Sequence, residues 1–299
     1  MLDKLEYLLA LARERNFGKA AESCGVTQPS FSAGIKQLED TLGATLVQRT
    51  SRFIGFTSEG ERVLEWARGI VADTRAMRAD VQTLKKGLTG HLRIAAMPVV
   101  LPMMARVTTP YHAKYPGVRF SLLSRTTAEI LVLLDNLEID AGVMYIDGEL
   151  PRGVRAVPFY RERYRLVTAP DSPLGDREQV TWAEVARIPL CLPAAGMRIR
   201  NIIDGLLTAA AGDLGPPPLE SDAMVVLFTH VRTGRWATVM PDKLAEALGL
   251  TQQLRSVPIV EPDATHQIGM LVPKREPSTA IVTALIAEVT AAARLLDHD

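Results

Sequence analysis

A long amphipathic segment over residues 58–88 constrains the fold of this chain more than any other feature of its sequence. Apolar side chains recur along it at alternating intervals of four and three residues, which is typical of a helix that pairs with another helix. The alternative is one face of an ordinary amphipathic helix inside its own domain. We expect a dimerising helix that begins with a capping box of Ser58 and Glu61 and in which Thr74 weakens packing. The seam comprises Val63, Ala67, Ile70, Thr74, Met77, Val81, Leu84 and Leu88.

The residues before this segment predict three shorter helices. The third is the best defined, because Thr27 is a suitable N-cap, Pro29 falls in the first turn and Gly43 closes the helix. Its expected buried face consists of Phe31, Ile35, Leu38 and Leu42. The opposite face carries small or polar side chains that fit against a major groove without steric conflict, namely Gln28, Ser32, Ala33, Lys36 and Asp40.

A β-hairpin is predicted directly after the third helix. Leu46 and Val47 form its first strand and residues 53–56 its second, and the segment between them carries Arg49 and Arg52. Arginine side chains at a hairpin tip can pair with DNA phosphates and fix the register of a protein without reading bases. Helices followed by such a hairpin predict a winged helix-turn-helix domain.

From Gly90 onward, short apolar or β-branched runs alternate with helical stretches, which is the pattern of an α/β unit. Residues 215–218 form a proline-rich loop, and residues 278–296 form a longer closing helix. The expected strands are residues 92–96, 118–123, 141–145, 166–169, 190–192, 219–221, 237–240 and 268–272.

Composition excludes several classes of protein. The 299 residues are 47% hydrophobic, which is enough to build two or three compact units. Because 34 basic residues balance 34 acidic ones, a DNA-binding role must rest on motif geometry instead of net charge. Charged residues interrupt the N-terminal leucines and no segment resembles a membrane span, so we expect a cytoplasmic protein without a membrane partner. Cys24 and Cys191 lack metal-site spacing, so we expect no metal and two reduced, buried thiols.

Short motifs in the first sixty residues carry a resemblance to a known family. They are Asn16-Phe17-Gly18-Lys19-Ala20-Ala21, Thr27-Gln28-Pro29-Ser30-Phe31-Ser32, Ile35-Lys36-Gln37-Leu38-Glu39, Leu42-Gly43, Leu46-Val47-Gln48-Arg49 and Thr57-Ser58-Glu59-Gly60. In order and spacing they closely resemble the LysR-type transcriptional regulators, and the rest of the chain fits that family more loosely in length and layout. Asn16 stands where a serine is usual and Val47 where a phenylalanine is common, and neither change removes a DNA-facing group.

The resemblance implies a division of the chain into three regions. Residues 1–58 would form the winged helix-turn-helix domain, residues 59–89 the linker and dimerisation helix, and residues 90–299 the effector-binding domain. This last domain is expected to have the type 2 periplasmic-binding-protein-like fold, in which strands cross between two α/β subdomains around a cleft. Subdomain I would comprise residues 91–163 and 268–299, and subdomain II residues 164–267, with the crossings near residues 161–165 and 265–269.

The start and exposed face of the third helix, together with the hairpin tip, form the expected DNA contact. A helical bundle that uses the same polar face for solvation is the alternative, but it does not explain the arginine-tipped hairpin. A dimer with two such helices favours a partly palindromic operator. The expected DNA-binding residues are Thr27, Gln28, Pro29, Ser30, Ser32, Ala33, Lys36, Arg49 and Arg52.

An effector is expected where loops leave strand ends and helix N-termini offer free amides, which suit an anion. The first such loop has Met97, Pro98 and Val99 where the family often has a serine or threonine, which weakens the case for carboxylate capture. The hydroxyls of Ser124, Thr126 and Thr127 can bond a ligand, but such hydroxyls also cap helices when no ligand is present. Cys191 fits an inert core thiol better than an oxidant sensor. His230 fits a satisfied surface or core histidine better than a ligand contact. Arg198 and Arg200, at the start of a helix, are placed either to reach an anionic ligand or to remain solvated, and solvation is favoured. The expected effector-binding residues are Met97, Pro98, Val99, Val100, Ser124, Thr126, Thr127, Tyr145, Cys191, Thr229 and His230.

The sequence therefore predicts a DNA-binding regulator and no enzyme, because nucleophile-elbow, zinc-protease, Walker and dinucleotide motifs are absent. The expected partners are promoter DNA, a small-molecule effector, RNA polymerase and further copies of the chain in a homodimer or homotetramer. Effector entry would rotate the subdomains and change the spacing of the DNA-binding heads. A DNA-binding protein without an effector is the alternative, but it leaves the α/β half unexplained. Residues 22–26 and 32–36 look like a LysR subgroup associated with formate dehydrogenase operons, which suggests that target.

Overall fold

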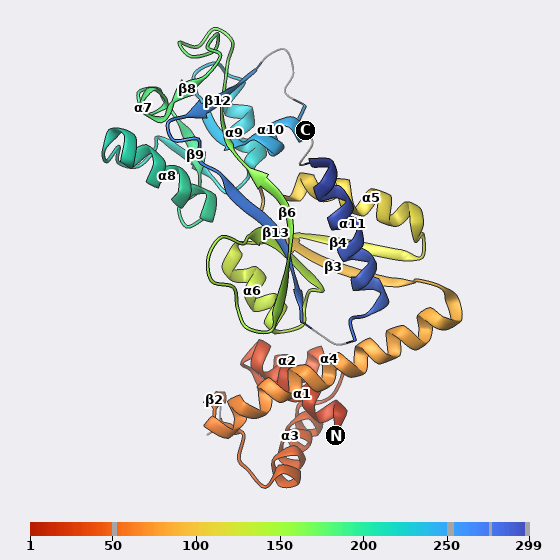
Figure 1. The fold of residues 1–299 in the computed structure, drawn as a ribbon. Helices are drawn as coiled ribbons and strands as arrows, with labels where there is room; N and C mark the ends of the chain where they lie inside the picture. Colours follow the sequence, from red (N-terminus) through yellow and green to blue (C-terminus); the bar gives the residue numbers. More distant parts are fainter. Residues whose placement is uncertain (50–52, 250–253, 275–276, 297–299) are drawn as a thin grey trace. The chain divides into compact units, whose positions relative to one another are not determined.

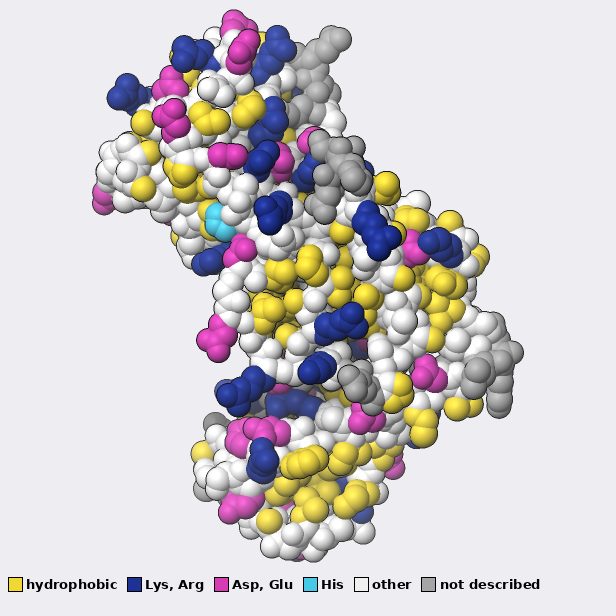
Figure 2. Space-filling model, viewed as in Figure 1, with side chains coloured by type: hydrophobic (Ala, Val, Ile, Leu, Met, Phe, Trp, Pro, Cys, Tyr) yellow, Lys and Arg dark blue, Asp and Glu magenta, His cyan; other side chains and the backbone are white. Residues whose placement is uncertain are grey.

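A computed structural model describes residues 1–49, 53–249, 254–274 and 277–296. Internal contacts divide the chain into two compact parts, one formed mainly by residues 1–87 and one by residues 88–299, and each is described by itself. Within the described ranges, no helix is long and apolar enough to cross a membrane. Basic and acidic side chains are interspersed on the face of each part that Figure 2 shows, as their equal numbers lead one to expect.

The first part has the predicted winged helix-turn-helix fold followed by a long helix (Figure 1). Side chains accept hydrogen bonds at the start of two of its helices, Asn16 from the Lys19 amide at 3.0 Å and Thr27 from the Ser30 amide at 3.4 Å. Its elements are α1 (Leu2–Glu14), α2 (Phe17–Ser23), α3 (Gln28–Leu42), β1 (Val47–Arg49), β2 (Phe53–Phe56) and α4 (Ser58–Lys86).

Two glycines in the first part allow elements to approach closely. A Cβ atom added to Gly34 of α3 would lie 2.8 Å from the ring of Tyr7 on α1. One added to Gly60, in the first turn of α4, would lie 2.1 Å from the carbonyl oxygen of Leu46. Both distances are far below van der Waals contact, so these glycines set how tightly the helices and the hairpin pack.

Three expectations for the first part are wrong. Thr57 caps α4 by accepting a hydrogen bond from the Gly60 amide at 2.9 Å, so the predicted capping box of Ser58 and Glu61 does not form. Leu42 is exposed, because α3 ends at this residue and Gly43 turns the chain in the left-handed conformation. Cys24 is half-buried instead of buried, because it lies just past the end of α2.

The residues of the predicted coiled-coil seam have different surroundings. Ala67 is buried in the core of the first part, where α4 packs against the shorter helices. Farther along α4, Ile70, Met77 and Val81 are exposed apolar side chains. Val63 and Thr74 are half-buried, and the side chain of Leu84 lies outside the described residues. Leu88 was wrongly placed in the seam, because α4 ends at Lys86 and Leu88 packs half-buried against the core of the second part. The exposed row therefore begins beyond the first turns of α4.

The second part contains two α/β subdomains (Figure 1). The first is built on a five-stranded sheet of order β4-β3-β5-β13-β6, in which β13 runs antiparallel to both neighbours. The second has a four-stranded sheet of order β11-β7-β12-β8 and a parallel pair of β9 and β10. The strands are β3 (Gly90–Ala96), β4 (Val118–Ser124), β5 (Ala141–Tyr145), β6 (Val154–Glu162), β7 (Tyr164–Thr168), β8 (Val180–Thr181), β9 (Cys191–Pro193), β10 (Leu219–Ser221), β11 (Thr238–Pro241), β12 (Arg255–Val260) and β13 (His266–Pro273).

The helices of the second part cover these sheets, and the buried apolar side chains of both subdomains form one continuous core. They are η1 (Leu101–Met104), α5 (Ala105–Lys114), α6 (Thr127–Asp135), α7 (Trp182–Val185), α8 (Arg198–Ala211), α9 (Met224–Val231), α10 (Asp242–Ala247) and α11 (Ala280–Leu296). The predicted fold class, a helix-turn-helix domain joined to an α/β domain, is confirmed.

Three strands were not predicted from the sequence. β6 and β12 contain Pro158 and Pro258, and an internal proline is a signal against a strand because it cannot donate to the ladder. In β6 the proline is accommodated where the register with β13 shifts, between Ile268 and Gly269. β8 has only two residues, too few to show a period.

The chain crosses between the two subdomains twice. β6 ends at Glu162 and β7 begins at Tyr164, so Arg163 alone makes the first crossing. β12 ends at Val260 and β13 begins at His266, so residues 261–265 make the second, slightly before the predicted residues 265–269. Because His266 pairs with Glu162 in the sheet, the two crossings lie side by side.

Candidate functional site

The outer face of α3 is the candidate DNA-binding surface. Gln28, Ala33 and Lys36 are exposed on it, and Ser32 is half-buried. Thr27, Pro29 and Ser30, at the start of the helix, are also exposed, and the hydroxyls of Thr27 and Ser30 lie 2.9 Å apart. The face is therefore polar and open, while Phe31, Ile35 and Leu38 bury the opposite side in the core.

Hydrogen bonds hold the hairpin in a fixed place beside this helix. Glu39 of α3 accepts bonds from the amides of Leu46 and Val47 through Oε1, at 2.8 and 3.1 Å. The Thr57 hydroxyl donates to the carbonyl oxygen of Thr45 at 2.6 Å. The predicted phosphate contacts fall at the edge of what is described: Arg52 lies outside the described residues, and only the backbone of Arg49, in β1, is described.

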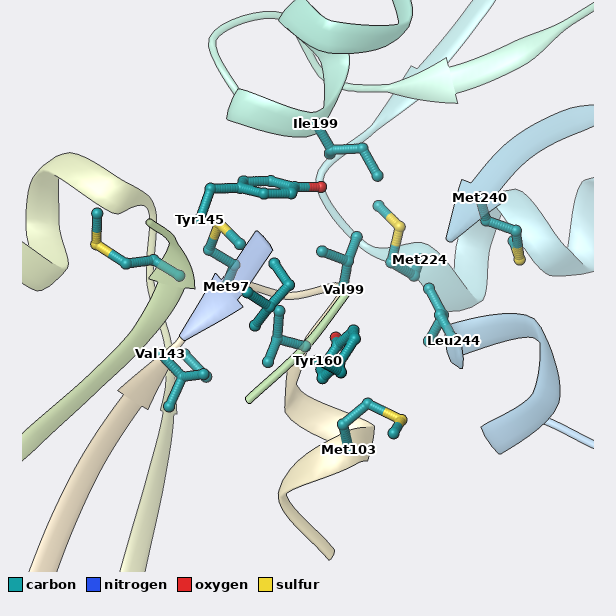
Figure 3. Packing of buried hydrophobic residues seen from close by; sticks show 14 of the residues in the cluster. Met97, Val99, Met103, Val143, Tyr145, Tyr160, Ile199, Met224, Met240 and Leu244 are labelled. Carbon is teal, nitrogen blue, oxygen red and sulfur yellow. The ribbon is translucent and has the colours of Figure 1, made fainter. Parts of the chain in front are cut away.

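The candidate effector site is a small pocket in the second part, contacted by both subdomains. The loop after β3 and the start of α6 line it from the first subdomain, and the residues around the start of α8 line it from the second. Its volume is about 20 Å³, enough for roughly one water molecule. Figure 3 shows three of the lining residues, Met97, Val99 and Ile199, packed among the buried apolar side chains of this region. The lining residues are Met97, Pro98, Val99, Thr126, Thr127, Met197, Arg198 and Ile199.

Five of the predicted effector residues meet at this pocket, and the other six do not line it. Val100 is buried in the core behind the loop, and Ser124 is exposed at the end of β4. Thr229 and His230 bond back to the carbonyl oxygens of Val225 and Val226 within α9, at 2.7 and 2.8 Å. These two side chains are satisfied by their own helix, as the alternative interpretation of His230 proposed. Tyr145 and Cys191 are the last two predicted effector residues that do not line the pocket.

Three pocket residues were missed by sequence reasoning: Met197, Arg198 and Ile199. Arg198 was considered and assigned to solvent, because no local pattern shows which subdomain faces the loop after β3. The sequence signal that could have found these residues is the loop between β9 and α8. A helix that begins after a short strand places its first residues at the carboxyl end of that strand. Thr127 also donates to the sulfur of Met97 at 3.5 Å, which joins two sides of the pocket.

Tyr145 does not point its hydroxyl at free space. The hydroxyl donates a hydrogen bond to Glu162, a carboxyl that is fully buried at the first crossing. Burial raises the pKa of Glu162 to about 8, because desolvation disfavours its charged form. The same effect raises the pKa of Tyr145 well above its ordinary value.

A larger cavity of about 380 Å³ lies within the second subdomain, away from the predicted effector loops. The proline-rich loop of residues 215–218, α8 and the apolar residues Leu190 and Leu192 line it. Arg200 lies beside it, almost fully buried, and its guanidinium bonds to Asp204 at 2.7 Å and Glu220 at 2.9 Å. Arg200 was expected to remain solvated, and the structure corrects this.

Cys191 and Cys24 lie in different parts of the chain and both are free thiols. Cys191 is fully buried on β9, and burial raises the pKa of its thiol to about 11. Burial also raises the pKa of Cys24. Since the thiolate is the reactive form of cysteine, neither environment activates the sulfur. Among the described residues, no group of three or more His, Cys, Asp or Glu side chains is placed to hold a metal ion.

A helix with an open polar face, a hairpin fixed beside it and a two-subdomain α/β unit together define a class of architecture, a winged helix-turn-helix domain and an α/β domain of two subdomains in one chain. Two family models match the chain in the same order: the bacterial regulatory helix-turn-helix protein, lysR family, over residues 2–61, and the LysR substrate binding domain over residues 85–294. The chain belongs to the LysR family. It is a LysR-type DNA-binding transcriptional regulator with an effector-binding domain, and not an enzyme.

Individual relatives are distant but span nearly the whole chain. The DNA-binding transcriptional dual regulator OxyR of Escherichia coli (strain K12) is 28% identical over 268 residues, which cover 89% of this chain and 87% of that protein. A full-length OxyR variant from Pseudomonas aeruginosa matches with a TM-score of 0.77 at 21% identity, covering 98% of this chain and 99% of that one. The regulator CbnR in complex with its target DNA matches with a TM-score of 0.61 at 21% identity, covering 98% and 100%. None of these supports a formate dehydrogenase target.

Proposed function

We propose that a small organic effector, largely apolar and carrying one anionic group, controls this regulator by binding between its subdomains. The observation that carries the proposal is that the pocket has residues of both subdomains on its walls, so a ligand there contacts both at once. Met97, Val99 and Ile199 supply apolar surface, and Arg198 is the cation at its rim. A ligand that binds one arrangement of the subdomains better than another shifts the population between them.

The closed pocket also indicates how the effector enters. A volume of about 20 Å³ cannot hold an organic molecule, so binding requires the subdomains to separate and then close around it. We therefore propose that Met97, Pro98, Val99, Thr126, Thr127, Met197, Arg198 and Ile199 form the effector site.

A second candidate stimulus, hydrogen peroxide, comes from the name of relatives called hydrogen peroxide-inducible genes activators. The cysteine environments of this chain argue against it. Cys191 is fully buried with a raised pKa, and Cys24 belongs to the other part of the chain. Peroxide reacts with an accessible thiolate, which neither site favours.

The conclusion that neither cysteine senses peroxide is tested by adding hydrogen peroxide to the reduced full-length protein and measuring its binding to its upstream DNA. We expect no change in affinity or footprint, and the same behaviour from Cys24→Ser and Cys191→Ser. A peroxide-dependent footprint that disappears in Cys191→Ser would restore the redox interpretation.

For DNA, we propose that two chains pair through α4 and present two α3 helices to a partly palindromic site. The exposed row of Ile70, Met77 and Val81 supports pairing, because apolar side chains of this size are costly to leave in water. The protein would then act in the cytoplasm as a homodimer or homotetramer at a promoter, with RNA polymerase as a further partner.

The DNA surface is tested by gel-shift binding to the intergenic DNA upstream of the protein's own gene, across a salt series. Ser32→Arg with Lys36→Glu places bulk and negative charge on the face of α3, so we expect affinity to fall by roughly 100-fold or more. Arg152→Glu, on an exposed loop of the second part, repeats the charge reversal of Lys36→Glu away from α3 and should bind as the wild type does. Equal binding by all three proteins would refute the assignment of this face.

The effector proposal is tested by screening small carboxylates with an apolar body, with thermal unfolding of the full chain as the readout. Arg198→Ala should bind such ligands more weakly at unchanged stability without ligand. Failure of every ligand to raise the unfolding temperature, together with intact DNA binding, would favour a DNA-binding protein without an effector.

A further inference from the structure

A cluster of ionisable side chains lies where the two crossings meet in the second part. Glu162 is the last residue of β6, before the first crossing, and His266 is the first residue of β13, after the second. They are paired in the sheet. Tyr164, the first residue of β7 in the second subdomain, bonds through its hydroxyl to Nδ1 of His266 at 2.9 Å. The cluster therefore spans both strands that connect the subdomains.

The carboxyl of Glu162 is completely buried and has only neutral partners. Tyr145 of β5 donates a hydrogen bond to Oε1, and the hydroxyl of Tyr160 lies 3.5 Å from Oε2. Within the described ranges, no Lys or Arg forms an ion pair with it. The two tyrosine hydroxyls lower the pKa of Glu162, but the cost of burying a carboxylate without a cation is the larger effect, so the neutral, protonated carboxyl is the form that this site favours.

The remaining groups around Glu162 reinforce this preference. Asp242, at the start of α10, adds negative charge and accepts hydrogen bonds from the amides of Arg163 and Lys243, at 3.2 and 2.8 Å. His266, whose pKa is lowered by burial, supplies no positive charge near neutral pH. Burial is the largest cause of the raised Glu162 pKa of about 8, and Asp242 acts in the same direction.

The groups around Glu162 come from both subdomains. Tyr145 and Tyr160 belong to the first sheet, while Tyr164 and Asp242 belong to the second subdomain. Separation of the subdomains, which the pocket requires before any organic molecule can enter, must bend the chain at Arg163 and at residues 261–265. Such bending draws Tyr164 and Asp242 away from the first sheet and admits water to the carboxyl, whose pKa in water is about 4.3.

We propose that opening of the cleft is linked to release of the Glu162 proton, so that Glu162 is a positioning residue whose protonation holds the subdomains closed. On opening, the carboxyl O–H bond breaks and the proton passes to solvent water. Between pH values of about 4.3 and about 8, the closed form therefore binds one proton more than the open form. Each unit rise in pH within this window raises the ratio of open to closed chains by up to about tenfold. Above a pH of about 8 the ratio stops changing.

The proposal rests on the effector cleft proposed above, but its test needs neither effector nor DNA, so failure of one is distinguishable from failure of the other. Spin labels are attached to the full-length protein at Ala128→Cys, on α6, and Ala195→Cys, before α8, both exposed near the pocket-lining residues. Cys24→Ser removes the half-buried thiol, and Cys191 is too buried to react. Labelled chains are diluted into unlabelled ones, so that only distances within a chain are measured by electron–electron double resonance across a pH series from acidic to alkaline.

We expect a longer distance to gain population as the pH rises toward about 8, and the short distance to persist at every pH in Glu162→Gln, whose neutral amide cannot ionise. Asp242→Asn removes the nearby negative charge while keeping the amide contacts, which lowers the pKa of Glu162 in the closed form, so the gain of the longer distance should level off at a lower pH and reach a smaller population. This second variant decides the matter if Glu162→Gln fails to fold. A distance independent of pH in the wild type, or one curve shared by the wild type and the variants, would overturn the proposal.

Discussion

The face of α3 and the pocket between the subdomains differ in how ready they are for a partner. The DNA-binding face is polar, exposed and fixed by bonds such as that from the Leu46 amide to Glu39. The pocket is filled by its own apolar side chains, Met97, Val99 and Ile199 among them, and has almost no free volume. One surface is preformed, whereas the other exists only after a movement. The difference places the conformational cost of regulation in the effector domain.

The largest effect is expected from Gly60→Ala, which tests whether the DNA-binding part is as rigid as the comparison requires. The new methyl group would lie 2.1 Å from the carbonyl oxygen of Leu46, so α4 and the hairpin must separate. We expect a loss of about 3 kcal/mol or more in the free energy of unfolding of this part, measured by urea denaturation.

Gly69→Ala is the matched control for that change. Gly69 lies on the same helix with nothing within 4 Å of an added Cβ, so alanine should stabilise α4 by about 0.5–1 kcal/mol. Equal effects of the two substitutions would show that the close approach at Gly60 is not a constraint.

The next largest effect is expected from Ile199→Ala, which tests whether the pocket is closed in the absence of ligand. Ile199 is 2% exposed, so truncation should cost about 2–4 kcal/mol of unfolding free energy in the second part. Ser32→Ala on the face of α3 should cost less than about 0.5 kcal/mol. An Ile199→Ala protein as stable as the wild type would indicate an open cleft, and the contrast between the two surfaces would disappear.

A pH-dependent effect of intermediate size follows from the buried carboxyl at the crossing. Because the folded pKa of Glu162, about 8, lies above its unfolded value of about 4.3, the folded state binds more protons over this window. Stability of the second part should therefore fall as pH rises from about 4.3 to about 8 and then level off. Denaturation of wild type and Glu162→Gln at several pH values checks this, and parallel curves would contradict it.

The smallest effect is expected from Arg198→Ala. Its side chain is exposed, so the unfolding temperature without ligand should change little, equivalent to less than about 0.5 kcal/mol. A larger fall in the unfolding temperature would show that Arg198 stabilises the closed pocket in the absence of ligand. Arg187→Ala, another exposed arginine of the second subdomain, serves as the control.

The two surfaces also differ in how far the sequence predicts them. The α3 face follows from local rules, because Thr27, Pro29 and Gly43 mark the ends of the helix and Phe31, Ile35 and Leu38 its buried side. The pocket depends on contacts between residues about a hundred positions apart, such as Met97 and Met197. No local period encodes such contacts, so Met197, Arg198 and Ile199 were missed.

The strand predictions show the same limit in another form. The strands of the first sheet were predicted where apolar runs are continuous, as in β5, but β6 and β12 were missed because of Pro158 and Pro258. The register shift that accommodates Pro158 is a property of the pair β6 and β13, which neither strand reveals alone.

The paired crossings bear on how proteins with this topology can evolve by exchange of a subdomain. Residues 163–265 leave the first sheet at Glu162 and return to it at His266, and those two residues face each other on neighbouring antiparallel strands. A short turn joining β6 directly to β13 would close the first subdomain as a hairpin. The second subdomain is thus one continuous insertion whose two ends lie next to each other. Recombination can exchange such a segment as a unit. The same DNA-binding domain would then respond to a different effector.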